Sequence, residues 1–215
     1  SAILTGLGVV AILTVIIVLL VLNVAKQRKI NSGHCEILKL NREVIETQLE
    51  LLSTLGEVIE SRSQDTANHV RRVAAYSALL GRKYGLSEEE ILLLEAASPM
   101  HDVGKIGISD TILLKPGPLT PEEYQMVQRH TVMGAEILSA AGFGENVVRW
   151  VLHHHERWDG RGYPMGLTGT DIPAGARILA VADAYEVMTT GRVYRGPVLP
   201  GQALEELHRQ RGAQF

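Results

Sequence analysis

The sequence predicts an all-α protein in which a long apolar segment precedes a bundle of five or more helices. Apolar residues recur at intervals of three, four and seven along most of the chain, which is typical of amphipathic helices. Sequences that cap helices separate the apolar segments. The regular alternation of apolar and polar residues that marks β-strands is not found in the sequence.

The first 25 residues contain no Asp, Glu, Lys, Arg or His. As a helix they would span roughly 37 Å, and a bilayer requires about 20 apolar residues. We therefore predict a transmembrane helix at 1–25, in preference to a buried core helix or a cleaved signal peptide. Lys26, Arg28 and Lys29 follow directly, so the positive-inside rule predicts that the remainder lies in the cytoplasm. Since the chain does not begin with Met, we expect a further region upstream.

Residues 26–50 are predicted to form a basic juxtamembrane cluster and a helical stalk. Apolar residues keep a helical spacing from Ile37 to Ile59, with charged residues between them. Two such stalks would pair in a homodimer. The same spacing also fits the first helix of the globular domain.

The overall composition excludes several classes of function. The 21 Lys and Arg residues are balanced by 24 Asp and Glu residues, so we expect no broad basic surface for duplex nucleic acid. Only 5% of the residues are aromatic, which argues against stacking platforms for single strands. Cys35 is the only cysteine, which excludes an internal disulfide framework and fits a reducing compartment.

Residues 51–215 are predicted to form the functional domain. The capping boxes Ser87–Glu90 and Thr120–Glu123 begin two of its helices. A loop rich in glycine and proline is expected at 158–175, with helices before and after it. Because the chain stops at Phe215, within or just after a helix, we expect the domain to continue beyond it.

The first candidate site is the segment His101-Asp102-Val103-Gly104-Lys105. Imidazole nitrogen and carboxylate oxygen are ligands of Zn, Fe and Mn. Adjacent residues of a helix diverge by about 100°, so both ligands face one site only if it is wide, such as a pair of ions about 3.5–4 Å apart. Asp102 would then bridge the ions, and Lys105 would meet a phosphate oxygen or protonate a leaving alkoxide. Taken alone, the pair favours an ordinary histidine at a helix end.

Three consecutive imidazoles, His153, His154 and His155, strengthen the metal hypothesis, because a solvated surface gains nothing from them. The segment 159–164 that follows turns tightly, since Gly tolerates positive φ and Pro fixes its own φ. Its alternative role is an ordinary turn between helices. Asp183 lies in an otherwise apolar run, and a buried carboxylate there requires a partner that a metal would supply.

These motifs carry a resemblance to a known family. Residues from about Leu51 to Phe215 resemble the HD-GYP domain, a branch of the HD metal-dependent phosphohydrolases. The resemblance rests on 101–105 and on 154–164, which contains the Gly-Tyr-Pro of the family's name. It implies an HD-type helical bundle that holds two or three divalent ions, usually iron or manganese, and hydrolyses the bacterial messenger cyclic di-GMP. Together with the predicted span at 1–25, the expected location is the bacterial inner membrane, with the catalytic domain in the cytoplasm.

Seven residues match the metal-ligand positions of this family. They are His69, His101, Asp102, His130, His154, His155 and Asp183. Members with three metals have a further acid, usually Glu, four residues before the first His, and Asp65 stands there in this chain. The resemblance therefore leaves open whether two or three ions bind. His130 is expected on the helix that begins at Thr120.

The resemblance also implies contacts to substrate. The family's lysine matches Lys105, and its basic groups near the substrate phosphates match Arg192 and Arg195. Tyr163 is a further candidate, because its ring can stack on guanine, and its alternative role is to pack the loop onto the domain. Glu186 stands where many members have Asp, and the sequence assigns it no role.

The predicted function is metal-dependent phosphodiester hydrolysis by a membrane-tethered enzyme. Two ions would produce hydroxide from a bridging water, Asp102 would position it, and Lys105 would assist the leaving oxygen, which yields pGpG or GMP. Expected partners besides cyclic di-GMP are a second copy of the chain, an upstream sensor region and a diguanylate cyclase. The alternatives are a catalytically silent HD-GYP receptor or interaction module, and an HD phosphohydrolase that acts on another nucleotide.

Overall fold

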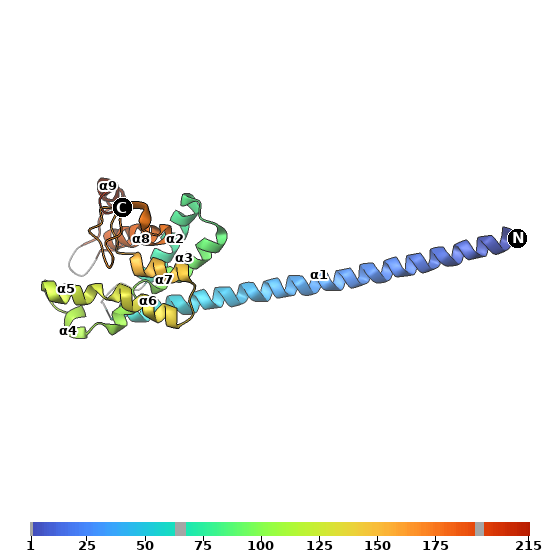
Figure 1. Cartoon of the computed structure of the whole chain (residues 1–215), viewed down its shortest axis with the longest axis horizontal. Helices are drawn as coiled ribbons and strands as arrows, with labels where there is room; N and C mark the ends of the chain where they lie inside the picture. Colours follow the sequence, from blue (N-terminus) through green and yellow to red (C-terminus); the bar gives the residue numbers. More distant parts are fainter. Residues whose placement is uncertain (1, 63–67, 192–195) are drawn as a thin grey trace. The chain divides into compact units, whose positions relative to one another are not determined.

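The computed structural model of the chain describes residues 2–62, 68–191 and 196–215, with side chains from Leu20 onward except that of Cys35. Within these ranges the regular structure is helical, apart from one isolated bridge between Asp159 and Thr168 (Figure 1). The prediction of an all-α protein is therefore confirmed. The helices are α1 (Ala2–Ser61), α2 (His69–Tyr84), α3 (Glu88–Met100), η1 (Val103–Gly107), α4 (Asp110–Leu113), α5 (Pro121–Gln128), α6 (His130–Ala140), α7 (Glu145–His153), η2 (Gly169–Asp171), α8 (Ala174–Thr190) and α9 (Pro200–Arg209).

The chain divides into two compact units, residues 1–48 and residues 49–215. The first unit consists of α1 alone, and from Leu20 to Gln48 its described residues are exposed except at Gly33. The last turns of α1 belong to the second unit, where Ile59 is buried in the core. At the end of α1, Ile59 therefore packs into the globular unit, whereas Leu51, Leu55 and Val58 are exposed.

In the described part of the chain, no helix is long and apolar enough to cross a bilayer. The predicted membrane location is therefore wrong. The described side chains of α1 begin at Leu20, and Lys26, Arg28 and Lys29 follow closely. Within the described residues, the apolar stretch before these charges is shorter than the roughly 20 apolar residues that a span requires.

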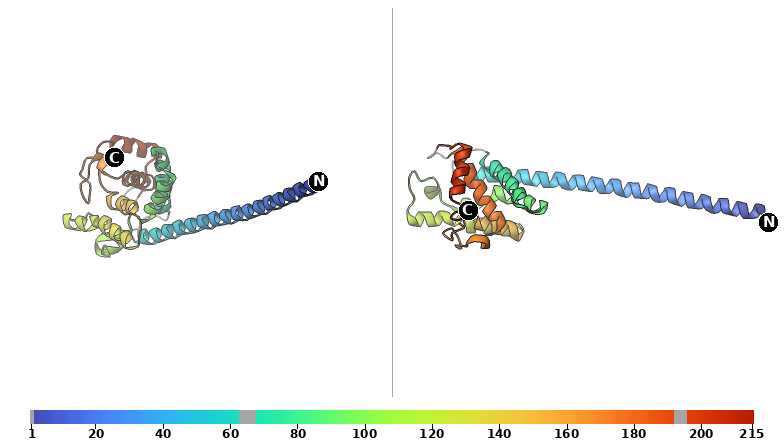
Figure 2. Two further views of the ribbon diagram at one scale, coloured as in Figure 1. Left: turned by 45° about the vertical axis from the view of Figure 1, so that its right-hand side comes forward. Right: turned by 90° about the horizontal axis from the view of Figure 1, so that it is seen from above.

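The core of the second unit lies between α2, α3, α6, α7 and α8. Helix α2 packs against α3 and α8, and α7 packs against α3, α6 and α8 (Figure 1). Each of these helices contributes a side chain that is 0–1% exposed, namely Val73, Leu94, Leu138, Val151 and Leu179. Burying a side chain of this kind stabilises a fold by about 1.5–3 kcal/mol. The short helices α4 and α5 lie at the edge of the unit (Figure 2).

Local sequence begins the helices where the capping pattern predicts. The hydroxyl oxygen of Ser87 accepts the backbone N–H of Glu90, and the Glu90 carboxylate accepts the backbone N–H of Ser87. Thr120 and Glu123 form the same reciprocal pair at the start of α5. Both predicted capping boxes are confirmed, and each satisfies N–H groups that a helix start leaves without partners.

Candidate metal centre

The seven predicted ligands lie in five segments of the second unit, mostly at helix ends. Helix α2 begins at His69, and α6 begins at His130. The expectation that His130 lies on the helix begun at Thr120 is wrong, since α5 ends at Gln128. The imidazole itself explains this break, because its Nδ1 lies 2.7 Å from the Val127 carbonyl at the end of α5.

The ligand atoms form two groups, and within each group they lie within 4.8 Å of one another. The first group, called here the α2/α8 group, consists of His69, His101 and Asp183. The second, called the imidazole group, consists of Asp102, His130, His154 and His155. Nitrogen and oxygen donors of this kind fit a divalent transition-metal ion in each group.

Asp102 lies between the two groups and faces both. Its Oδ2 is 3.3 Å from His101 Nε2, and its Oδ1 is 3.1 Å from His130 Nε2. A carboxylate with one oxygen toward each of two ions is the geometry that a two-metal site requires. Asp102 Oδ1 is also buried and has no hydrogen-bond partner among the described residues.

Three imidazoles share one orientation, in which Nδ1 faces the backbone carbonyl of the residue three positions earlier. The pairs are His101 with Ser98, His130 with Val127 and His154 with Val151, at 2.7, 2.7 and 2.6 Å. A carbonyl only accepts, so Nδ1 carries the proton in the neutral ring and Nε2 presents a lone pair. These Nε2 atoms are buried and, in the described part of the chain, have no hydrogen-bond partner. Buried polar atoms are rarely left so, and a metal would satisfy them.

His69 is oriented by an acid instead. Its Nδ1 pairs with the Glu186 carboxylate, and its Nε2 faces Asp183 Oδ1 at 3.6 Å. Glu186 is also held by Arg72 Nε and the Thr190 hydroxyl, each at 2.8 Å. Burial raises the pKa of Glu186, but these donors outweigh it and lower the pKa to about 2. The sequence analysis missed this role, although Glu186 lies three residues after Asp183 and so on the same face of α8.

The two groups differ in electrostatics. Burial lowers the pKa of His101, but the nearby carboxylates of Asp102, Asp183 and Glu60 outweigh burial and raise it to about 10. For His155, burial and the neighbouring imidazoles lower the pKa to about 3. Without a metal, the His101 ring is therefore positively charged at neutral pH, whereas the His155 ring is neutral.

Lys105 reaches the site through a 3₁₀ turn rather than through a continued α-helix. Helix α3 ends at Met100, and the Lys105 N–H donates to the Asp102 carbonyl at 2.9 Å. Residues three apart eclipse one another in a 3₁₀ helix, so the two side chains meet. Lys105 Nζ lies 2.6 Å from Asp102 Oδ2 and 3.1 Å from Glu60 Oε1. Gly104 allows this packing, because a Cβ there would lie 1.9 Å from the His130 carbonyl oxygen.

The Gly-Tyr-Pro loop closes one side of the imidazole group. The Glu156 carboxylate accepts the backbone N–H groups of Met165 at 2.7 Å and Leu167 at 3.0 Å. This holds the loop against the end of α7, where the half-buried Tyr163 ring lies 4.9 Å from the His155 ring. Tyr163 is therefore placed beside a candidate ligand of the imidazole group.

Three of the predicted site residues, Asp65, Arg192 and Arg195, lie outside the described residues. His153 is buried, lies 3.5 Å from Glu156, and belongs to neither ligand group. Of three consecutive imidazoles, therefore, only the second and third reach the candidate metal centre.

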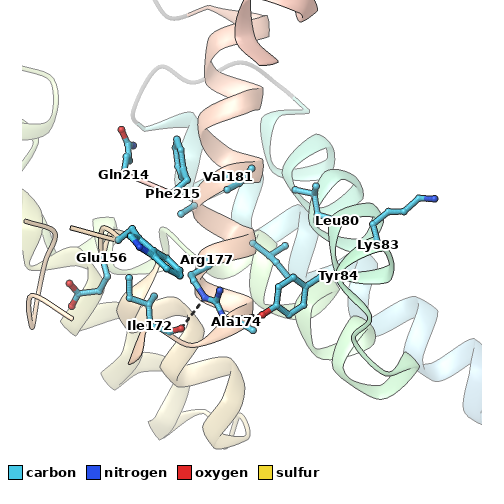
Figure 3. Close-up of a pocket in the computed structure, with 13 residues that line it drawn as sticks. Leu80, Lys83, Tyr84, Glu156, Ile172, Ala174, Arg177, Val181, Gln214 and Phe215 are labelled. Carbon is cyan, nitrogen blue, oxygen red and sulfur yellow. Dashed lines mark hydrogen bonds between the residues drawn. The ribbon is translucent and has the colours of Figure 1, made fainter. Parts of the chain in front are cut away.

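A separate pocket of about 410 Å³ lies between α2, α8 and the C-terminal residues (Figure 3). Its walls are mainly apolar and aromatic, and the guanidinium of Arg177 lies 5.5 Å from the Tyr84 ring and 5.8 Å from the Trp158 ring. None of the seven ligands lines this pocket. It is distinct from the candidate metal centre.

The sequence profile of the HD domain family matches residues 53–215, and the chain belongs to this family. The chain is 42% identical over 182 residues to a 3'3'-cGAMP-specific phosphodiesterase of Vibrio cholerae, covering 84% of this chain and 35% of the relative. It is 41% identical over 192 residues to a cyclic di-GMP phosphodiesterase response regulator of Xanthomonas campestris, covering 88% and 50%. A cyclic di-GMP phosphodiesterase of Thermotoga maritima is 42% identical over 166 residues, covering 75% and 43%.

These relatives confirm the HD-GYP resemblance, and the chain spans between about a third and a half of their lengths. Among solved structures, a cyclic GMP-AMP specific phosphodiesterase of V. cholerae superposes with a TM-score of 0.62 at 19% identity, covering 78% of this chain and 45% of that one. An HDG"Y"P protein of Bdellovibrio bacteriovorus superposes with a TM-score of 0.56 at 20% identity, covering 80% and 60%. These two likenesses show the HD-type fold.

Proposed function

We propose that residues 51–215 are the catalytic domain of a metal-dependent phosphodiesterase that hydrolyses a cyclic dinucleotide. The observation that carries this proposal is the position of Asp102, whose two oxygens face two separate groups of buried ligands. The names of the relatives, which are phosphodiesterases for cyclic di-GMP and 3'3'-cGAMP, support the substrate class. All seven candidate ligands fall within the two groups, which supports a catalytic domain over a catalytically silent receptor.

In this proposal each group would hold one divalent ion, and Asp102 would be available as a ligand to both. Such ions lower the pKa of a bound water to near 7 and polarise phosphoryl oxygens. The nitrogen and oxygen donors suit iron or manganese, and Asp65 is the candidate for a third site. The remaining chemistry belongs to the side chains around the ions, which orient the attacking oxygen and the phosphodiester.

Lys105 acts in this proposal as a fixed positive charge at the leaving oxygen. Burial lowers its pKa, but the carboxylates of Asp102 and Glu60 outweigh burial and raise it, so the ammonium stays charged at neutral pH. A fixed charge beside the oxygen that accumulates negative charge stabilises the transition state. Tyr163 is placed to stack on a base of the substrate, and Arg192 and Arg195 are the candidates for its phosphates.

We propose cyclic di-GMP as the substrate, with linear pGpG or GMP as the product. The second candidate is 3'3'-cGAMP, which is favoured by the relative that is 42% identical over 84% of this chain. The two substrates differ in one base, so the choice depends on contacts to the bases rather than on the metal ligands.

We also propose a homodimer that pairs through α1. Val44, Leu51 and Val58 repeat at intervals of seven and are 54%, 65% and 61% exposed. Exposed apolar residues that recur at every seventh position form the seam along which two helices pair. Light scattering of the whole chain would give twice the monomer mass if this is correct, and the monomer mass if it is not.

The test of the function is chromatography of each dinucleotide after anaerobic incubation with the whole chain loaded with Fe(II) or Mn(II). Metal-dependent appearance of pGpG or GMP supports the proposal if the His101→Ala/Asp102→Ala double variant yields neither. His153→Ala is the matched control, because that imidazole is buried beside the site but belongs to neither group. Bound metal with both dinucleotides unchanged contradicts the proposal.

A further inference from the structure

Lys105 has a buried carboxylate partner that comes from a distant helix. Glu60, in the last turn of α1, is 4% exposed, and its Oε1 lies 3.1 Å from Lys105 Nζ. Its Oε2 is buried and lacks a hydrogen-bond partner within the described ranges. A buried acid of this kind is costly unless it is paired, so the ammonium and Glu60 stabilise one another.

The other carboxylate at Lys105 is that of Asp102, at 2.6 Å. Asp102 belongs to the imidazole group and also faces His101, so its oxygens are the ones that two bound ions would draw away from Lys105. Glu60 belongs to neither ligand group. It is therefore the carboxylate that can keep its contact with the ammonium when metal is bound.

Residues at the end of α1 contact the chain both before and after the segment 101–105. Gly56 packs so closely that a Cβ there would lie 2.3 Å from the Pro99 carbonyl oxygen, just before His101. Beyond that segment, Arg62 pairs with Asp110 at 2.7 Å and donates to the Ile106 carbonyl at 3.3 Å. These contacts leave little freedom for the backbone that carries Glu60.

We propose that Glu60 is a positioning residue, which holds the Lys105 ammonium toward the leaving oxygen of the substrate. The inference rests on the proposed function, because it assigns the role of one side chain in that reaction. It makes the last turn of α1 part of the active site, although α1 contributes none of the seven ligands.

The experiment compares turnover of Glu60→Gln and wild type, both loaded with metal. Gln keeps the size of the side chain and removes its charge, so kcat falls about 10- to 100-fold while KM and metal content stay unchanged. In a Lys105→Met background the same substitution has no further effect on kcat, because Glu60 acts through Lys105. Glu57→Gln is the matched control, since Glu57 lies one turn earlier and pairs with Arg71 at 2.7 Å.

Multiplicative losses in the double variant, or loss of metal in Glu60→Gln, would overturn the inference. A second readout does not depend on turnover, namely the NMR signal of the Lys105 ζ-ammonium, assigned by its loss in Lys105→Met. Glu60→Gln shifts this signal if the pair exists, and an unchanged signal contradicts it. An inactive wild type with a shifted ammonium signal would overturn the phosphodiesterase role while retaining the pairing of Glu60 with Lys105.

Discussion

The two ligand groups are neighbours, but they differ in how their imidazoles are oriented, since in the α2/α8 group His101 faces a backbone carbonyl and His69 faces an acid. The imidazole group uses backbone carbonyls, since Nδ1 of His130 and of His154 faces the carbonyl three residues earlier. In the α2/α8 group, His69 depends on the side chain of Glu186. A backbone carbonyl is fixed by the helix end itself, whereas an acid is replaceable by one substitution. Orientation of an imidazole by a backbone carbonyl is therefore insensitive to substitution, whereas the orientation of His69 can be changed by substituting Glu186.

The groups also differ in charge. The α2/α8 group contains His101, whose pKa the surrounding carboxylates raise to about 10 against the effect of burial. The imidazole group contains His155, whose pKa falls to about 3 through burial and the nearby imidazoles. A proton thus competes with metal at one group and not at the other, because a ligand nitrogen must be deprotonated before it binds.

The largest expected effect comes from Asp102, which belongs to the imidazole group and also faces His101 of the α2/α8 group. Asp102→Ala removes both ions, because each group loses the carboxylate between them, and turnover falls at least about a thousandfold, equivalent to about 4 kcal/mol. Elemental analysis of the purified variant and product chromatography measure the two effects. Two retained equivalents of metal would show that Asp102 does not bridge.

Substituting one ligand in each group tests the two groups separately. His69→Ala and His155→Ala are each expected to remove about one ion and to reduce turnover about a hundredfold or more, because one ion of a pair is not sufficient for hydrolysis. Metal content by elemental analysis is the measurement, with His153→Ala as the control that retains both ions. If either variant loses both ions, the groups form one cooperative site instead of two.

A smaller effect is expected from the acid behind His69. Glu186→Gln keeps the size of the side chain but weakens the orientation of His69, so metal affinity at the α2/α8 group falls about 10- to 100-fold. Affinity at the imidazole group stays unchanged, because Nδ1 of His130 and of His154 faces a backbone carbonyl and not Glu186. Competition with a chelator of known affinity gives both values, and an equal loss at both groups would contradict the comparison.

The smallest effects concern pH in the metal-free protein. The pKa of His101 is raised from 6.5 to about 10, so its contribution to stability is complete below pH 6.5 and is lost as the pH rises to about 10. The pKa of His155 is lowered from 6.5 to about 3, so its neutral burial destabilises the fold as the pH falls from 6.5 to about 3. Each slope is at most about 1.4 kcal/mol per pH unit.

Thermal unfolding in chelator across these two pH ranges tests both signs. His101→Asn flattens the alkaline slope and leaves the acid slope, whereas His155→Asn does the reverse. The wild-type slopes contain other titrating groups, so the differences between the variants are the quantities to compare. Identical profiles for the two variants would show that the groups do not differ in charge.

Much of the candidate site was predictable because most of its residues lie in short sequence motifs. All seven ligand types occur in short segments, and the structure brings all seven into the two groups. Glu60 and Glu186 were not predictable in the same way, because their partners lie 45 and 117 residues away along the chain. An isolated glutamate on an amphipathic helix has the same appearance in sequence whether it faces solvent or a buried lysine.

Other differences have local causes. The sequence places His130 inside a helix, but the structure begins α6 there, and its Nδ1 faces the Val127 carbonyl near the end of α5. The apolar start of the chain predicts a membrane helix, which the residues searched do not show. Periodicity recognises helices well, but it does not say where a helix is interrupted or what covers its apolar face.

The sequence by itself determined the helical class, the helix starts at Ser87 and Thr120, and the seven candidate ligands. These depend on residue type, short spacing and hydrogen bonds between near neighbours. Only the tertiary structure decided which ligands share a group, that Asp102 faces both groups, and that Glu60 and Glu186 support Lys105 and His69. Those relations arise when burial of the apolar core brings distant helices together, and no local pattern records which polar side chains then meet.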